Sequence, residues 1–428
     1  MKSIITAIFC LIMMAGTIAQ DAQKAIKTVN KNIGKFNIDP AGSAGLLDES
    51  ITILEDAFKS EIVMNDPEAW NTKGQLFNEI SKSEINAKII KSDYVLRHPD
   101  ASLIAFEAFQ NGMVKALKKF HTKDALAGIR ENEDYLNNTG IFYFQEQNYD
   151  AAFKYFEASL KAYDLLKKNK ADSRLDEGNA KTDQEFYTGV SAYYGSDNKK
   201  ALPYFESLVA GGNAQVLVYV GLFTLYSETD EAKAFKYLED AKKLYPDENE
   251  ILFAEINYYI KTNRLDDLVN KLKLAIEKEP ENVSVYNALG NVYDQLNQKE
   301  RTAGNAVKAD EYFNAALDYF TQVTKKDPAN FDAIYSSGAL YYNKAAGMVD
   351  GLNKLSNDLS AAGFKKYDAM KAEMDKLFNE ALPYFLQAET LNDKDLNTVI
   401  AIKEIYARQG KLEKSAEYKA KMDALSGN

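Results

Sequence analysis

The chain has 428 residues, of which 46% are hydrophobic and 27% charged, a composition typical of a folded globular protein and not of a disordered chain. Its formal net charge of −11 argues against a broad nucleic-acid surface and against attraction to anionic lipid headgroups. Only 8 prolines accompany 27 tyrosines and 22 phenylalanines, which favours long, tightly packed helices.

Residues 1–19 are expected to be a secretory signal peptide. A basic start at Lys2 precedes an uncharged, largely apolar run, and small residues lead up to a cleavage point after Ala19. The run is shorter than the roughly 20 apolar residues of a membrane-spanning helix, so an uncleaved anchor is the weaker reading. Cleavage removes Cys10, the one cysteine, and leaves no disulfide or cysteine-based metal site. We therefore expect a periplasmic or secreted protein without stable membrane insertion after cleavage.

Residues 20–167 are expected to form N-terminal helical repeats. Gly74 and Gly140 lie where one helix of a pair must approach its partner closely, and Trp70 lies four residues before Gly74. The polar segment 168–182 follows, with no apolar stripe, and we expect it to be a linker between an N-terminal and a C-terminal stack.

Residues 183–428 show the clearest internal repeat. Similar residues recur 34 positions apart, at Ala241 and Ala275, Pro246 and Pro280, and Tyr259 and Tyr293. Over the N-terminal and C-terminal repeats together, a small residue recurs in the first helix of successive pairs, at Gly74, Gly140, Gly189, Gly221, Gly290 and Gly338. A second-helix pattern spaced by four and three residues recurs as Ala152-Phe156-Ser159, Ala201-Phe205-Leu208, Ala234-Leu238-Ala241, Ala316-Phe320-Val323 and Ala381-Phe385-Ala388. These residues are predicted to form the core, with Tyr293 packed on Phe320.

The 34-residue period and the segment Pro280–Tyr293, which carries Tyr286, Leu289 and Gly290, resemble the tetratricopeptide repeat. The resemblance covers about eight repeats and implies an all-α solenoid of helix-turn-helix pairs that winds into a right-handed superhelix. The long insertions also resemble those of extracytoplasmic tetratricopeptide proteins of Bacteroidota.

Two insertions break the period. Gly290 and Gly338 are 48 residues apart, 14 more than the period, which predicts about two extra turns on each helix of one pair. Residues 343–380 carry two apolar stripes at helical spacing, joined near residues 361–363. They are expected to form a long helical hairpin, and its apolar tip residues Leu355, Leu359 and Phe364 are a candidate contact surface.

No pattern of catalytic residues is present in the sequence. The two histidines, His98 and His121, have no ligand-like spacing, and the phosphate-binding and serine-hydrolase glycine motifs are absent. We therefore expect no enzyme, no cofactor and no metal site.

The resemblance instead implies a partner-binding groove lined by repeat positions 2, 5, 9, 12 and 13 of each first helix. Transferred to this chain, these positions are Phe186, Val190, Tyr193 and Tyr194, then Asn287, Asn291, Asp294 and Gln295, then Asp332, Tyr335, Tyr342 and Asn343. Amides can pair with a peptide backbone, and tyrosines offer stiff contact area. The basic residues of the heat-shock carboxylate clamp are missing from these positions. We expect an exported scaffold that binds a protein or peptide but no nucleic acid. The alternative is a glycan- or nutrient-binding envelope protein on the same scaffold, since stacked tyrosines also bind sugars.

Overall fold

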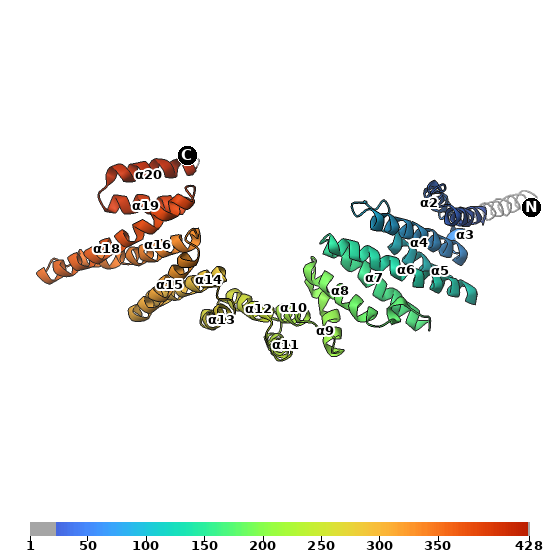
Figure 1. Ribbon diagram of the computed structural model, residues 1–428, viewed down its shortest axis with the longest axis horizontal. Coiled ribbons are helices and arrows are strands. Elements are labelled where there is room, and N and C mark those ends of the chain that lie inside the picture. The colour runs from blue at the N-terminus through green and yellow to red at the C-terminus, as the bar shows by residue number, and fades with distance from the viewer. Residues whose placement is uncertain (1–22, 427–428) are drawn as a thin grey trace, which may run out of the picture. The chain divides into compact units, whose positions relative to one another are not determined.

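The computed structural model describes residues 23–426, in which every regular element is a helix (Figure 1). The described chain divides into two compact units, with the boundary between Tyr245 and Pro246. In unit 1 a helix over residues 23–38 precedes α2 (Gly45–Ala57), α3 (Glu61–Met64), α4 (Pro67–Ile90), α5 (Ala101–Val114), α6 (Lys119–Gln145), α7 (Tyr149–Lys168), η1 (Arg174–Asp176), α8 (Ala180–Tyr194), η2 (Asn198–Ala201), α9 (Leu202–Ala210), α10 (Val216–Tyr226) and α11 (Glu231–Leu244). Unit 2 contains α12 (Asn249–Lys261), α13 (Leu265–Lys278), α14 (Val283–Thr302), α15 (Ala306–Lys326), α16 (Phe331–Ala346), α17 (Val349–Leu355), α18 (Ala361–Leu391), α19 (Leu396–Arg408) and α20 (Leu412–Leu425).

Consecutive helices pack as pairs throughout the described chain. In unit 1 the pairs are α4 with α5, α6 with α7, α8 with α9 and α10 with α11. In unit 2 they are α12 with α13, α14 with α15, α16 with α18 and α19 with α20. First helices also contact one another, as α4 does with α6 and α14 with α16. The predicted fold class, an all-α array of helix-turn-helix repeats, is confirmed.

In five of the eight pairs in the described chain, a phenylalanine of the second helix packs on a glycine of the first. A Cβ placed on Gly290 would lie 2.6 Å from the Phe320 ring, which is closer than real Cβ contacts come. The same contact recurs between Gly140 and Phe156. Other copies join Gly74 with Phe109, Gly189 with Phe205 and Gly338 with Phe385. Glycine at these positions therefore lets the two helices approach closely.

The predicted second-helix core is buried. Ala152, Phe156, Ala201, Phe205, Ala234, Leu238, Ala316, Phe320, Ala381 and Phe385 are each no more than 1% exposed. One predicted contact is different: Tyr293 stacks on Tyr319, with ring centroids 5.7 Å apart, and not on Phe320. Phe320 lies over Gly290, so Tyr293, almost one turn further along α14, meets the neighbouring residue of α15.

The polar segment 168–182, expected to be a linker, lies within unit 1. Ser173 and Leu175 are buried there, and Glu133 of α6 accepts hydrogen bonds from the Ser173 hydroxyl (2.6 Å) and the Arg174 N–H (2.9 Å). The division into compact units thus falls at Tyr245–Pro246, some way beyond the expected boundary. The segment's role as a linker between two stacks of repeats stays a prediction.

The lengthened pair has the predicted form. Helix α14 has 20 residues and α15 has 21, whereas the preceding helices α12 and α13 have 13 and 14. Each lengthened helix therefore gains seven residues, or about two turns. Leu296, in the added part of α14, and Ala309, in the added part of α15, are buried, so the apolar faces of both helices continue into the extension.

The predicted hairpin is helical, but its helices end at other residues than expected. The first arm is interrupted at Gly347 and Met348, which leaves the seven-residue α17, and the turn spans residues 356–360. Leu352 and Met374 lie in one buried cluster, so the two apolar stripes do cover each other. Ser360 caps α18 by accepting a hydrogen bond from the Gly363 N–H at 3.0 Å.

Two sequence expectations concern export and membranes. The expected signal peptide, residues 1–19, lies outside the described residues. From residue 23 to residue 426, no helix is long and apolar enough to cross a bilayer.

Candidate partner-binding surface

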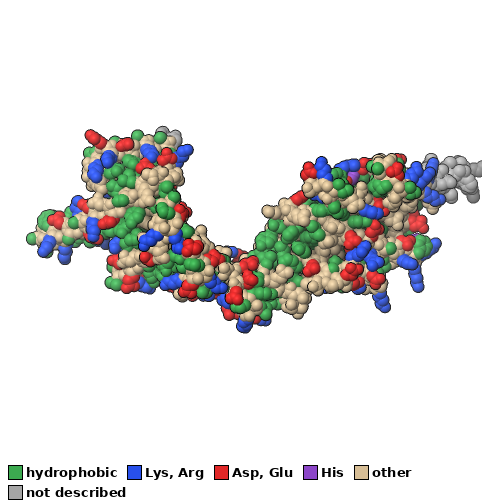
Figure 2. All heavy atoms as spheres, in the orientation of Figure 1, with side chains coloured by type: hydrophobic (Ala, Val, Ile, Leu, Met, Phe, Trp, Pro, Cys, Tyr) green, Lys and Arg blue, Asp and Glu red, His purple; other side chains and the backbone are tan. Residues whose placement is uncertain are grey.

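The expected groove residues of α8 belong to an aromatic cluster in unit 1. Phe186 and Tyr193 are half-buried, Val190 is buried, and Tyr194 is 52% exposed. Tyr193 packs on Phe205, and Tyr194 packs on Tyr149 with ring centroids 5.4 Å apart. Figure 2 shows hydrophobic side chains gathered over the part of unit 1 where Figure 1 labels α8.

Sequence reasoning missed Tyr187, which is 42% exposed and lies in the same cluster. Its ring meets Phe144 of α6 edge-on, with centroids 5.5 Å apart. Tyr187 follows Phe186, a groove position, by one residue, so the repeat pattern did not point to it. The signal that could have found it is the run of aromatics Phe186, Tyr187, Tyr193 and Tyr194 on one short helix.

On α14 the four expected residues lie one or two turns apart along one side. Asn291 and Gln295 are exposed, whereas Asn287 and Asp294 are half-buried. The Asn287 Oδ1 is buried and has no hydrogen-bond partner. The Asp294 carboxylate accepts hydrogen bonds from Asn297 (3.2 Å) and Gln298 (2.8 Å) of its own helix, and burial raises its pKa.

On α16 the expected residues divide into two kinds. Asp332 and Asn343 are exposed, whereas Tyr335 and Tyr342 are half-buried. Both tyrosine rings pack edge-on against Phe385 of α18, and the Tyr342 hydroxyl donates a hydrogen bond to Glu404 of α19. Burial raises the pKa of both tyrosines. These two side chains hold α16 against its neighbours, so Asp332 and Asn343 are the residues of α16 most open to a ligand.

The hairpin tip presents apolar side chains to solvent. Leu359 is 76% exposed and Phe364 is 55% exposed, whereas Leu355 is half-buried. Leu359 lies in the turn and Phe364 in the first turn of α18. The structure thus brings the three expected tip residues to one end of the hairpin.

The histidines take part in contacts within unit 1. His98 lies 3.2 Å from an Asp48 oxygen, and the buried His121 accepts a hydrogen bond from the Leu117 N–H through Nδ1. Over residues 23–426, no three His, Cys, Asp or Glu side chains are grouped as metal ligands.

No family model matches the chain, and no curated protein matches it. Among solved structures, it is similar to the MamA protein, with 14% identity and a TM-score of 0.33 over 50% of this chain and 92% of that one. It is also similar to YrrB, described as a tetratricopeptide protein with an unusual peptide-binding site, with 15% identity and a TM-score of 0.34 over 52% and 93% of the two chains. A third structure, a human IFIT1 dimer with PPP-AAAA, shows 15% identity and a TM-score of 0.29 over 96% and 95%.

These TM-scores are too low to carry an argument about function or detailed architecture. The helix pairs, their 34-residue period and the recurring glycine–phenylalanine contacts define the class instead: an all-helical, tetratricopeptide-like repeat protein. The narrower resemblance to extracytoplasmic proteins of Bacteroidota stays a prediction.

Proposed function

We propose that the protein is an exported interaction scaffold that binds an extended peptide or protein segment along α14 and α16 of unit 2. The observation that carries this proposal is a set of amide side chains with free hydrogen-bonding capacity. Within the described residues, the side chains of Asn291, Gln295 and Asn343 make no hydrogen bond to the protein, and the Asn287 Oδ1 is buried without a donor.

Free amides suit an extended peptide, because each can donate to a backbone carbonyl and accept from a backbone N–H. The buried Asn287 Oδ1 adds a specific reason for a ligand. A buried acceptor without a partner costs about 1–3 kcal/mol, and a peptide N–H that reaches it recovers that free energy.

The charges beside the amides favour a neutral or basic peptide. Asp332 is exposed on α16, and Asp294 lies between Asn291 and Gln295 on α14. An acidic ligand or a free C-terminal carboxylate would meet both acids at close range, which disfavours it. This matches the missing basic residues of the carboxylate clamp.

A peptide array screened with the full chain tests the proposal. We expect neutral and basic sequences to bind in preference to acidic ones. The double change Asn291→Ala and Asn343→Ala should weaken binding of the selected peptides at least tenfold. Asn314→Ala, on the exposed side of the second helix α15, is the matched control and should change binding less than twofold. If the two variants weaken peptide binding equally, the groove along α14 and α16 is not the binding site.

Export is the second part of the proposal and is supported by the sequence of residues 1–19. The mature chain should begin at Gln20 or Asp21. N-terminal sequencing of protein from the envelope fraction of its native host tests this, and retention of Met1 in that fraction would contradict it.

The exposed rings of Tyr187 and Tyr194 favour one second candidate function, glycan binding by unit 1. Sugar rings stack on exposed aromatic faces, and these two tyrosines lie on the same short helix. Isothermal titration with soluble glycans decides between the two functions. Binding that is lost in Tyr187→Ala but kept in Asn291→Ala would favour the glycan role.

A further inference from the structure

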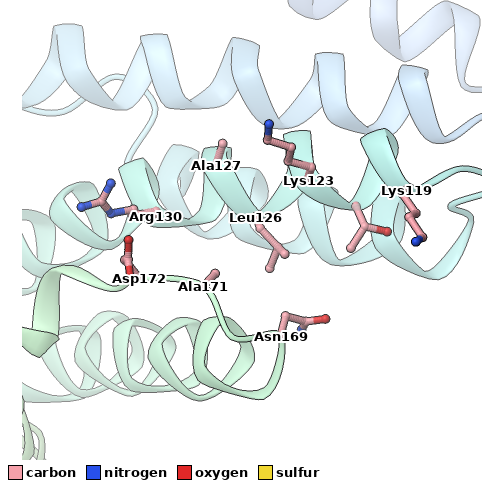
Figure 3. A pocket seen from close by; sticks show the side chains of 9 residues that line it. Lys119, Lys123, Leu126, Ala127, Arg130, Asn169, Ala171 and Asp172 are labelled. Carbon is pink, nitrogen blue, oxygen red and sulfur yellow. The ribbon is translucent and has the colours of Figure 1, made fainter.

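A trough in unit 1 runs between the N-terminal half of α6 and the segment that follows α7 (Figure 3). Its volume is about 640 Å³. One wall is formed by Lys119, Thr122, Lys123, Leu126, Ala127 and Arg130 of α6, and the other by Asn169, Ala171 and Asp172.

The α6 wall of the trough contains three basic side chains and no acidic one, although the chain as a whole has a net charge of −11. Lys119, Lys123 and Arg130 follow one another at spacings of four and seven residues, which places them on one face of the helix. All three are exposed, and within the described residues none forms an ion pair within 4 Å. Positive charge at the first turn of α6 is reinforced by the helix dipole, since its N-cap residue Lys118 supplies no side-chain cap.

The opposite wall is held in place by buried contacts. Glu133 of α6 accepts hydrogen bonds from the Ser173 hydroxyl and the Arg174 N–H, directly after Asp172. Leu175 is buried, and Lys167 forms an ion pair with Asp176 at 2.9 Å. These contacts fix both ends of the segment 169–172, so the trough is a formed feature and does not depend on a ligand to order it.

The trough is separate from the groove positions of the repeat. Gly140 is the small residue at repeat position 8 of α6, which puts position 1 at Glu133. Lys119, Lys123 and Arg130 all precede it, on an N-terminal extension of α6. A ligand in the trough would therefore use residues that the repeat pattern does not assign to binding.

We propose that this trough binds an acidic segment of a protein partner in extended form. From Lys119 to Arg130 the three cations span about 16 Å of helix axis, at about 1.5 Å per residue. One phosphate or carboxylate cannot reach all three, whereas an extended segment of about five residues covers that length. The apolar side chains of Leu126, Ala127 and Ala171 contact the ligand between the charges.

Fluorescence anisotropy with the full chain tests the proposal. The probe is a labelled eight-residue peptide of alternating Asp and Ser, and its Asn–Ser analogue is the neutral control. We expect the acidic peptide to bind more weakly as salt increases, and the neutral analogue to bind at least tenfold less tightly than the acidic one.

Charge reversal locates the site. The triple variant Lys119→Glu, Lys123→Glu and Arg130→Glu should weaken binding at least tenfold. The matched control reverses Lys27, Lys31 and Lys35, three exposed lysines at regular spacing on the helix over residues 23–38, and should change binding less than twofold. Since all six residues are exposed, both variants should keep the parent melting temperature. A glutamine version of the trough variant provides a second test if the reversal disturbs folding.

Substitution of Asp172 should change peptide affinity in the opposite direction to the charge reversal. This aspartate lies on the far wall and repels an acidic ligand, so Asp172→Asn should tighten binding of the Asp–Ser peptide about two- to fivefold. Three results would overturn the proposal: equal loss in the trough variant and its control, weaker binding by Asp172→Asn, or displacement of the peptide by inorganic phosphate or citrate at concentrations near that of the peptide. The last result would identify a site for small anions.

Discussion

Asparagine has two opposite roles on the first helices of the pairs. Asn71 and Asn78 of α4 donate hydrogen bonds to the backbone carbonyls of His121 (3.0 Å) and Gly128 (2.9 Å) of α6, and so join neighbouring first helices. The Oδ1 atoms of Asn71 and of Asn287 on α14 both lack a donor, so the difference is the hydrogen bond that the Asn71 amide donates to α6. Asn71 and Asn287 occupy the same repeat position, so the sequence alone cannot say which amide is structural and which is available to a ligand.

The two roles predict different stabilities. Asn78→Ala should lower the free energy of unfolding by about 1–3 kcal/mol, because the carbonyl of Gly128 loses its side-chain donor and the amide of Asn132 keeps only its hydrogen bond to the Ser102 carbonyl. Asn287→Ala removes an acceptor that is already unpaired and should change the free energy of unfolding by about 0.5 kcal/mol or less. Urea unfolding of both variants gives the comparison. A loss in Asn287→Ala as large as in Asn78→Ala would mean that Asn287 has a structural partner.

Asp294 predicts a pH effect at the proposed groove. Burial raises the pKa of its carboxyl group, and the hydrogen bonds from Asn297 and Gln298 offset this only in part. The folded state therefore binds the proton more tightly than the unfolded state, and this stabilisation is lost as pH rises through the raised pKa. Asp294→Asn removes the effect.

The difference in urea midpoint between Asp294→Asn and the parent should therefore shift in favour of the variant as pH rises from about 4, the ordinary pKa of an aspartate, towards neutrality. A difference that moves the other way would mean that the two amide hydrogen bonds outweigh burial.

At the scale of elements, the hairpin shows what apolar spacing can and cannot predict. The stripes identified the two arms, because residues three or four apart share a helix face. They did not identify the interruption at Gly347 and Met348 or the turn at residues 356–360. Those ends depend on local contacts: Ser360 caps α18, and Gly363 packs so closely on Asp358 that a Cβ there would lie 2.3 Å from the Asp358 carbonyl oxygen. Spacing carries no information about such contacts.

The hairpin also gives a test of the tip. Leu359→Ser and Phe364→Ser together should leave the melting temperature almost unchanged, since both side chains are mostly exposed. Leu352→Ser is the contrasting variant and should lower it clearly, because Leu352 is 6% exposed and belongs to the buried cluster with Met374. If the tip is a contact surface, the exposed pair will weaken capture of proteins that the parent chain retains from the envelope fraction, without this loss of stability. Unchanged capture would restrict binding to the helix faces.

At the scale of the whole molecule, the chain consists of two compact units that meet in sequence between Tyr245 and Pro246. Each has a buried cluster of its own, one from Ile26 to Leu166 in unit 1 and one from Ala345 to Tyr406 in unit 2. The sequence did not reveal this boundary. Pro246 lies 34 residues before Pro280 and so continues the repeat period, and no break in the pattern marks the boundary. Residues 168–182 lie within unit 1 and contact α6 there, and their role as a linker between two stacks stays a prediction.

The separate cores predict that each unit folds alone. Chains covering residues 20–245 and 246–428 should each give a helical circular-dichroism spectrum and a cooperative thermal transition. Local contacts support this, because each repeat in such an array is stabilised mainly by its neighbours. Either fragment losing its helical signal would show that the cores are interdependent.

The matched lengthening of α14 and α15 restricts how the gene for this chain can change length. Seven added residues extend a helix by almost two full turns, so the apolar face stays in line. One or two added residues instead rotate the rest of the helix by about 100° or 200° and move its apolar face away from its partner. A gain in one helix alone would leave its extra turns uncovered. Related genes should therefore differ here by paired insertions of about seven codons, one on each side of the loop at residues 303–305, and rarely by single codons. The period of the helix thereby limits which insertions can persist during evolution.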